Sequence, residues 1–517
     1  MIANFTSEVL PGSFSQYFSI LVPSYFLIYL PTRFIYRLYF DALSGIPGPK
    51  PRLFSDLLTR VYNLATGRSG LLIFRLREWH DQYGPIVRLS SNEVHINDID
   101  TYNQIFKVAT NYPKTKFYYS SPSTKHSLLD LRDFHAVHLR RSALQPYFSK
   151  GSVRKLEGLI QTKIDQFLDR LSESKDVINI SRGFRCLTCD VITTYSYEKC
   201  FEALSHPTFS PDWLVALEDL ISTAQLTVAL PGLTITMQWI FQNIIGRERA
   251  KKISPNVANA MEFEEHCRIA VLKQQERWNA GERNLVTIFE QLFQGDEKKG
   301  RKAATKDELA GEALLTVAAG MDTTGHTLTV ATYNLVKYPE IQEKLLKELM
   351  TVMPHPKSEI KEEILDRLPF LQACLKESLR FSHGVSNPLA RDVPPTGANI
   401  LGYDLPPGTI TMNSHYIYHT NSTVFPDPLR WNPGRWSGPD EKVKQMDNYF
   451  MPFSRGARIC IGLNLAWAEM LLTLARLVRR FEITYSEDFA DSNMEWVSMF
   501  VPVTKGMLTV NVKERKE

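Results

Sequence analysis

The stretch FSRGARICIG, residues 453–462, is the most specific part of this 517-residue chain. Its cysteine, Cys460, lies three residues before a helical pattern that runs from Leu463 to Phe481. The N-terminus of a helix carries unpaired N–H groups and about half a positive charge, and both stabilise a thiolate. Gly456 allows a tight loop, and Gly462 allows close approach of the backbone. A lone cysteine is more often buried and inert, but the whole ten-residue pattern favours a metal ligand.

Arg458 stands two residues before the cysteine, where it could reach an anionic group beside the sulfur. A thiolate that donates electron density to an iron porphyrin needs such a loop. The stretch resembles the haem-ligand loop of the cytochrome P450 monooxygenases, Phe-x-x-Gly-x-Arg-x-Cys-x-Gly, at every fixed position. The resemblance implies haem b as cofactor, with Cys460 as its axial thiolate and metal ligand. It also implies that Arg458 contacts a haem propionate, that Phe453 packs beside the sulfur and that Gly456 shapes the loop.

A second stretch, in the helical pattern from Asp307 to Tyr338, resembles the family's long central helix over the distal haem face. Gly320 and Gly325 lie inside this helix, where each costs up to about 1 kcal/mol relative to alanine. Glycine is worth that cost in stability where a flat cofactor must approach the backbone closely. Asp322 and Thr323 beside the gap are then candidates to relay protons to bound oxygen. The alternative is a solvated acid and a threonine bonded back to a carbonyl.

The motif Glu377-x-x-Arg380 resembles the family's Glu-x-x-Arg signature, with Arg435 as its third member. One carboxylate between two guanidinium groups makes a strong bidentate lock, which we expect to hold the haem-side loop in place. The motif is weak by itself, because Glu265-x-x-Arg268 has the same form. Its position before the cysteine loop carries the assignment.

Two further arginines resemble the family's propionate ligands. Arg141 matches the helix that binds one propionate, although Val137 replaces the tryptophan or histidine often found four residues earlier. Arg391 resembles the strand arginine that serves the other propionate. The alternative for either arginine is an ordinary surface charge. Cys186-x-x-Cys189 could be a redox or metal pair, but two buried thiols are the better interpretation.

Composition is that of a globular protein, with 44% apolar and 22% charged residues. The net charge of +4 and the absence of a long basic tract argue against nucleic acid as a partner. Six cysteines are too few for a disulfide scaffold. The fold class predicted is mainly α with small peripheral β-sheets, the cytochrome P450 fold. Helices are expected at 153–171, 307–338, 340–352, 368–381 and 463–481, and strands at 86–89, 94–96, 409–412 and 507–512.

The N-terminus predicts a membrane anchor, because no charged side chain lies between Glu8 and Arg33. Basic residues follow that stretch, so the positive-inside rule puts the body in the cytosol. We expect residues 1–45 to form the anchor and its flank, 46–52 a stiff non-helical proline-rich hinge, and 53–517 a single haem-binding catalytic domain at the endoplasmic reticulum membrane. A signal peptide, a buried helix and an interfacial helix are alternatives. Asn4 is a glycosylation candidate if the helix spans.

By family analogy, the substrate pocket should be lined by 112–129, 217–245, the central helix, 385–389 and 496–501, all rich in apolar residues. The chain looks most like microsomal fungal enzymes that tailor terpenoids and polyketides, which implies hydroxylation or epoxidation. No flavin or nicotinamide motif occurs, so electrons should come from NADPH through a separate cytochrome P450 reductase, with cytochrome b5 as a second candidate donor. The reductase is expected near Arg140, Lys442, Lys444 and Arg455. An isomerase or dehydratase of the same fold, a haem carrier and a membrane scaffold are the rival functions.

Overall fold

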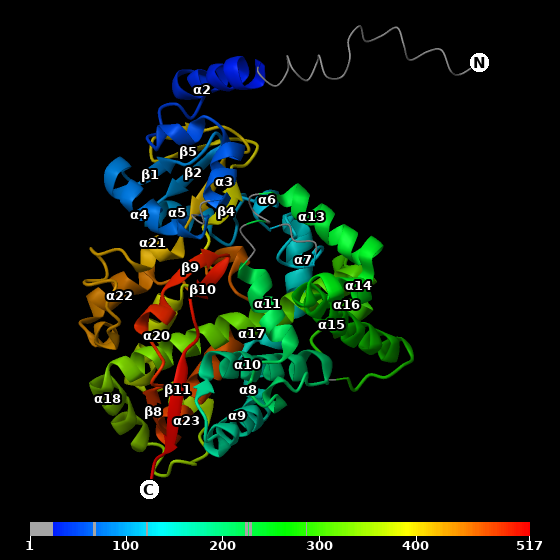
Figure 1. Ribbon diagram of the computed structural model, residues 1–517, viewed down its shortest axis with the longest axis vertical. Helices are drawn as coiled ribbons and strands as arrows, with labels where there is room; N and C mark the ends of the chain where they lie inside the picture. Colours follow the sequence, from blue (N-terminus) through cyan, green and yellow to red (C-terminus); the bar gives the residue numbers. More distant parts are fainter. Residues whose placement is uncertain are drawn as a thin grey trace.

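The computed structural model describes residues 24–65, 69–119, 123–222, 226, 230–285 and 287–516. Helices dominate it and the sheets are small, as predicted; β9 and β10 lie near the middle of the view rather than at its edge (Figure 1). The longer helices are α2 Leu30–Tyr39, α3 Asp56–Ala65, α4 Leu72–Tyr83, α7 Phe134–Leu144, α9 Glu157–Glu173, α10 Ile180–Tyr197, α11 Asp212–Ser222, α13 Pro231–Ile240, α14 Gly246–Ile253, α15 Pro255–Asn279, α17 Lys306–Lys337, α18 Pro339–Met350, α20 Pro369–Ser382, α22 Asp440–Tyr449 and α23 Leu463–Arg480. The shorter ones are α5 Ile99–Ile105, α6 Lys116–Tyr119, α8 Lys150–Lys155, α16 Glu290–Gln294, α19 Glu362–Leu365 and α21 His415–His419.

The strands form four small sheets. Their bounds are β1 Ile86–Arg88, β2 Glu93–Ile96, β3 Ile178–Asn179, β4 Leu389–Asp392, β5 Ala398–Ile400, β6 Tyr403–Leu405, β7 Ile410–Asn413, β8 Phe481–Tyr485, β9 Trp496–Met499, β10 Val501–Thr504 and β11 Thr509–Glu514. The largest sheet has the order β1-β2-β7-β4, with β2 and β7 parallel and the other pairs antiparallel. All four predicted strands are present, shifted by no more than two residues.

Helix α17 runs through the middle of the molecule and packs along α10 (Figure 1). A capping box starts it, because Thr305 accepts from the backbone N–H of Glu308 while the Glu308 carboxylate accepts from that of Thr305. The helix ends at Lys337, with Tyr338 as its C-cap and Pro339 next, as the predicted end at 338 requires. The main core cluster joins α9, α10, α17, α20 and α23, so the two helices that carry the expected site rest on buried packing.

The predicted helix over 153–171 was wrong in one respect, because the structure divides it into α8 and α9. The division falls at Leu156, whose ψ of −3° is far from the helical value. Ser149 caps the first piece by accepting from the backbone N–H of Ser152. The apolar periodicity continues across the break, which is why the sequence suggested a single helix.

The proline-rich hinge also differs from the prediction of a non-helical connector. Lys50–Leu53 forms a turn of 3₁₀ helix, and Pro47 O accepts a hydrogen bond from the Arg88 N–H at 2.8 Å. Gly48 lies so close to Arg88 that a Cβ there would be 2.3 Å from its carbonyl oxygen. Residues 46–53 are therefore packed against β1.

Most of the stretch predicted to cross a membrane lies outside the described residues. Within the described part of the chain, no helix combines the length and the apolarity that a membrane crossing needs.

Candidate active site

A cavity of about 320 Å³ lies between α17 and the loop that precedes α23. Its walls are largely apolar and come from widely separated parts of the chain. They include Leu128, Leu129, Ile192, Leu315, Ala319, Val385, Leu389 and Phe500. Three of the segments predicted to line a pocket, around 112–129, 385–389 and 496–501, contribute to it, as does the central helix. No described residue of 217–245 does.

Cys460 and Phe453 both line this cavity, and the Cys460 side chain is exposed to it. The loop is closed by a hydrogen bond from the Cys460 N–H to Phe453 O at 2.9 Å. Burial among protein groups raises the pKa of the Cys460 thiol from 9.0, while the Gly462 N–H and the charge of Arg141 act to lower it. The groups that stabilise a thiolate are in place, and a metal bound to the sulfur would complete its deprotonation.

Gly456 is required by the shape of the loop. Its φ of +68° lies in the left-handed region, and a Cβ would stand 2.0 Å from Phe106 O. The neighbouring Ala457 N–H donates to Lys107 O at 3.4 Å. The cysteine loop is therefore seated directly on the chain that follows α5.

Four cations share the cavity: Lys114, Arg141, Arg391 and Arg458. Among the described residues none of them forms an ion pair, and their hydrogen bonds go to neutral oxygens. Arg141 donates to Ile459 O at 2.7 Å, and Arg458 to Leu131 O at 2.8 Å. Arg391 donates to the Tyr119 hydroxyl at 3.0 Å, and Lys114 to Leu129 O at 2.9 Å.

The cations repel one another. Burial, then the charges of Arg391 and Arg141, lower the pKa of Arg458 to about 10. Burial and the same kind of repulsion hold the pKa of Lys114 well below its usual value. The Nη1 atom of Arg458 is buried without a hydrogen-bond partner. Such a cluster fits a doubly anionic group, as the two propionates of haem b would be, and Cys460 in the same cavity fits its iron.

On α17 the structure separates the two residues of the expected proton relay. Thr323 lines the cavity and donates from Oγ1 to Ala319 O at 2.8 Å. Asp322 is not among the lining residues and accepts from Arg185 Nε at 2.7 Å. Arg185 is also within 3.4 Å of Glu218, so the acid belongs to an ion-pair group between α10, α11 and α17.

The two glycines of α17 have a physical reason besides the predicted approach of a flat cofactor. A Cβ on Gly325 would stand 3.1 Å from the backbone nitrogen of Arg185, and one on Gly320 would stand 3.2 Å from Ile192. Both glycines therefore permit close packing of α17 on α10. Gly320 also lines the cavity, whereas Gly325 does not.

Glu377 on α20 is completely buried and accepts from several donors. Arg380 donates to both of its oxygens, at 3.0 and 2.8 Å, and Arg435 Nε donates to Oε1 at 3.0 Å. Trp436 Nε1 and the Asn432 N–H add two more hydrogen bonds. The similar motif formed by Glu265 and Arg268 is an exposed surface pair.

Sequence reasoning did not single out Lys114, which lies in the predicted lining segment 112–129, and missed His415; both line the cavity. Neither stands in a motif, and only the fold brings them to Cys460. Arg140 was wrongly placed on the reductase side, because it is buried in ion pairs with Glu308 and Glu312 of α17. Lys442 and Lys444 are exposed on α22.

The remaining motif, Cys186 and Cys189, is a pair of buried free thiols on α10, as predicted. Burial raises the pKa of both. Within the described residues no group of histidine, cysteine and acidic side chains has the arrangement of a metal site.

Comparison with known proteins agrees with this site. A family model described as cytochrome P450 matches residues 51–510. Cytochrome P450 monooxygenases of Ascocoryne sarcoides and Penicillium terrestre are 34% and 29% identical to this chain; the alignments cover 88% and 95% of this chain and 90% and 96% of theirs. A tryptophan 6-hydroxylase of Fusarium equiseti is 28% identical over 90% of each chain. Since the match extends over nearly the whole sequence and includes the cysteine loop, the chain belongs to the cytochrome P450 family.

Proposed function

We propose that this haem-thiolate monooxygenase inserts one oxygen atom from O2 into a lipophilic small molecule, by hydroxylation or epoxidation, in fungal secondary-metabolite biosynthesis. The observation that carries the proposal is that one largely apolar cavity holds Cys460, Thr323 and the four cations. Its relatives support the class of reaction, since their names describe monooxygenases and a tryptophan hydroxylase. Terpenoids and polyketides are the substrate classes that we propose.

Each part of the cavity has a distinct task. Cys460 would hold the iron of haem b, while Arg141, Arg391, Arg458 and Lys114 would hold its propionates. When bound, haem supplies the activation of oxygen, and its thiolate ligand favours cleavage of the O–O bond. The apolar walls exclude water and bind the substrate by burial.

Protons are proposed to reach the reacting oxygen past α17. Thr323 holds a proton at Oγ1 on the cavity wall. Asp322, one residue earlier, would supply protons from the side of α10 after leaving Arg185. The relay therefore requires the carboxylate to exchange its partner.

We further propose that the protein works at the endoplasmic reticulum membrane, held by its N-terminal segment. Exposed apolar side chains on two described segments support contact with lipid. They are Leu27, Ile28, Tyr29, Ile35 and Tyr39 near α2, and Leu233, Ile235, Met237 and Trp239 on α13, both in the upper half of Figure 1. NADPH would deliver electrons through a separate cytochrome P450 reductase, with cytochrome b5 as a second donor, near Lys442 and Lys444.

The test is a comparison by mass spectrometry of extracts from the native host with and without the gene. Accumulation of a lipophilic precursor and loss of a product heavier by one oxygen would support the proposal and identify the substrate. Loss of a product of unchanged mass, or one lighter by one water, would overturn it in favour of an isomerase or dehydratase.

A further inference from the structure

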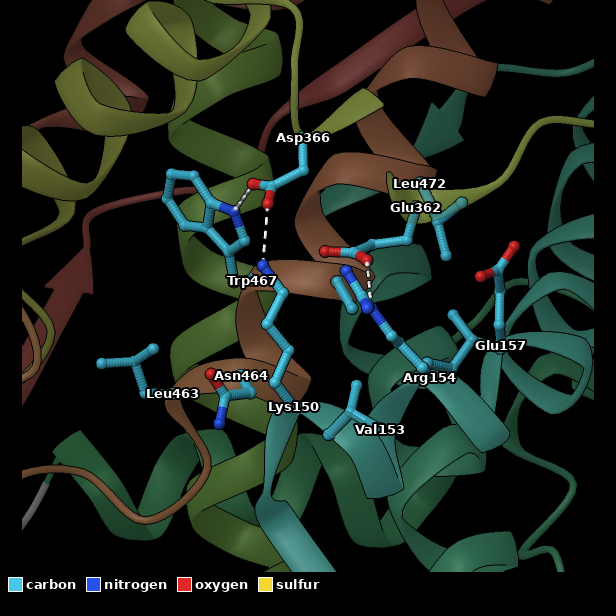
Figure 2. Close-up of a pocket in the computed structure, with 12 residues that line it drawn as sticks. Lys150, Val153, Arg154, Glu157, Glu362, Asp366, Leu463, Asn464, Trp467 and Leu472 are labelled. Carbon is cyan, nitrogen blue, oxygen red and sulfur yellow. Dashed lines mark hydrogen bonds and ion pairs between the residues drawn. The ribbon is translucent and has the colours of Figure 1, made fainter. Parts of the chain in front are cut away.

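A second hollow, of about 280 Å³, lies on the opposite face of α23 from the haem cavity. Figure 2 shows the residues that line it. Helix α23 contributes Leu463, Asn464, Trp467, Ala468 and Leu472 to this cleft, and Leu465, Ala466, Glu469 and Met470 to the haem cavity. The two linings have no residue in common. The volume of the cleft is just below the lower limit of about 300 Å³ that is usual for small-molecule pockets.

The cleft combines an apolar floor with charged walls. Val153, Ile160, Ala468 and Leu472 are buried and form the floor. Two cations, Lys150 and Arg154, and three carboxylates, Glu157, Glu362 and Asp366, surround it. The carboxylates therefore exceed the cations by one.

Two of the three carboxylates accept hydrogen bonds from side chains of the protein. Asp366 accepts from Trp467 Nε1 and from Lys150 Nζ, each at 2.9 Å, as Figure 2 shows. Glu157 accepts from Gln161 Nε2, also at 2.9 Å. Asp366 thus has both oxygens occupied, and Glu157 is only half-buried, so water can serve as its further partner.

Glu362 is different. It is 6% exposed, it lines the cleft, and neither of its oxygens accepts a hydrogen bond from a described residue. The nearest cation is Arg154, whose Nε lies 3.8 Å from Oε2, too far for a hydrogen bond. Burial and the charge of Asp366 raise the pKa of Glu362. A buried carboxylate without a donor costs free energy that a cationic ligand would recover.

We propose that this cleft is a second ligand site, which binds a small organic cation. The ligand would carry a guanidinium or ammonium group on a short apolar chain. The cationic group would donate hydrogen bonds to Glu362, in place of the distant and half-exposed Arg154. The chain would lie on the floor formed by Val153, Ile160 and Leu472.

The position of the cleft links it to the thiolate side of the haem cavity. Leu463 and Asn464 follow Cys460 by three and four residues. Asn464 Nδ2 donates to Phe148 O at 2.8 Å, and Phe148 lines the haem cavity. A ligand in the cleft would thus contact the first turn of the helix that starts behind Cys460.

The test uses n-butylguanidinium as probe, titrated calorimetrically into the haem-loaded full chain. A guanidinium ion stays protonated, so it does not coordinate iron. We expect saturable binding that weakens about fourfold for each methylene removed from the chain, the factor typical of a buried methylene.

Glu362→Gln should weaken binding about tenfold or more, because a charge-assisted pair is lost. Glu363→Gln is the matched control: it makes the same charge change one residue away, outside the cleft lining, and should leave affinity within about twofold.

A second pair of variants tests the role of Arg154. Arg154→Gln removes the cation that competes for Glu362 and should tighten binding several-fold, whereas Lys155→Gln, outside the lining, should not. The proposal is overturned if butylguanidinium shows no saturable binding. It is also overturned if Glu362→Gln binds as well as the wild type, which would place the probe elsewhere, or if Glu363→Gln is equally impaired.

Discussion

Asp322 and Arg185 form a buried ion pair, with Arg185 Nε 2.7 Å from Asp322 Oδ1. The acid expected to pass protons into the cavity is thus turned toward α10, while Thr323 beside it faces the cavity. Proton transfer then depends on breaking a hydrogen-bonded charge pair.

Asp322→Asn should lower kcat by about 100-fold or more, because an acid that transfers protons contributes about that much. Steady-state turnover with the natural substrate measures it. Arg182→Gln is the control, since Arg182 lies on α10 like Arg185 and pairs with Glu218 of α11 without contacting Asp322. An unchanged kcat in Asp322→Asn would remove the acid from the relay.

Thr323→Ala should leave the fold intact and reduce the product formed per NADPH consumed, with the difference released as peroxide. The reason is the loss of the hydroxyl that is proposed to hold a proton on the cavity wall, at Thr323 Oγ1. Peroxide and product are measured in the same reaction. Thr316→Ala, which removes a similarly bonded hydroxyl about two turns away on the same cavity wall, is the control.

Glu377→Gln should lower the free energy of unfolding by about 3–5 kcal/mol, because it leaves two buried guanidinium groups without their carboxylate. Urea denaturation gives the value. The exposed copy of the motif supplies the control: Glu265→Gln should change stability by less than about 0.5 kcal/mol. Equal losses of stability in the two variants would contradict the structural role assigned to Glu377.

Acid should destabilise the protein through His326. Burial lowers its pKa to about 4, below the ordinary 6.5, so the unfolded chain binds the proton first as pH falls. The contribution of neutral His326 to the free energy of unfolding is therefore fully present above pH 6.5. It is lost as the pH falls toward 4, at up to about 1.4 kcal/mol per pH unit. Urea unfolding at several pH values should show a shallower dependence of stability on pH for His326→Gln than for the wild type, and an equal dependence would contradict the prediction.

Arg458→Gln should weaken the retention of haem about tenfold or more, because a charge-assisted hydrogen bond to a propionate would be lost. Without haem the same variant should not be less stable, since it relieves repulsion with Arg391 and Arg141. Transfer of haem to an acceptor protein measures the first effect and urea unfolding the second. Arg367→Gln, on the surface, is the control.

The sequence predicted the parts of the molecule that depend on local pattern. The central helix, its end before Pro339 and the helix behind Cys460 follow from apolar periodicity and from proline. The break at Leu156 was missed because periodicity continues through it. Likewise, glycine was correctly judged costly inside α17, but the neighbour that requires it is a helix, which only the fold reveals.

The residues of the site also fall into two groups, those that a sequence motif predicts and those that only the fold brings together. A motif located Cys460 and Arg458, since both stand in one short loop. The partner of Asp322 is 137 positions earlier in the chain, and nothing near Arg185 marks it. Lys114 could not be distinguished from a surface lysine, because its burial among arginines arises from tertiary contacts alone.

The seating of Gly456 on Phe106 has a consequence for the order in which the protein is assembled. Arg455 Nη1 reaches Asn103 Oδ1 at 2.6 Å, across 352 positions of the chain. A contact of such separation closes late, because the entropy of a very long loop must first be overcome. The iron-binding loop should therefore reach its final shape only after the N-terminal and C-terminal parts have packed together. Binding of the cofactor would then occur only in a chain that has been synthesised and folded to its end.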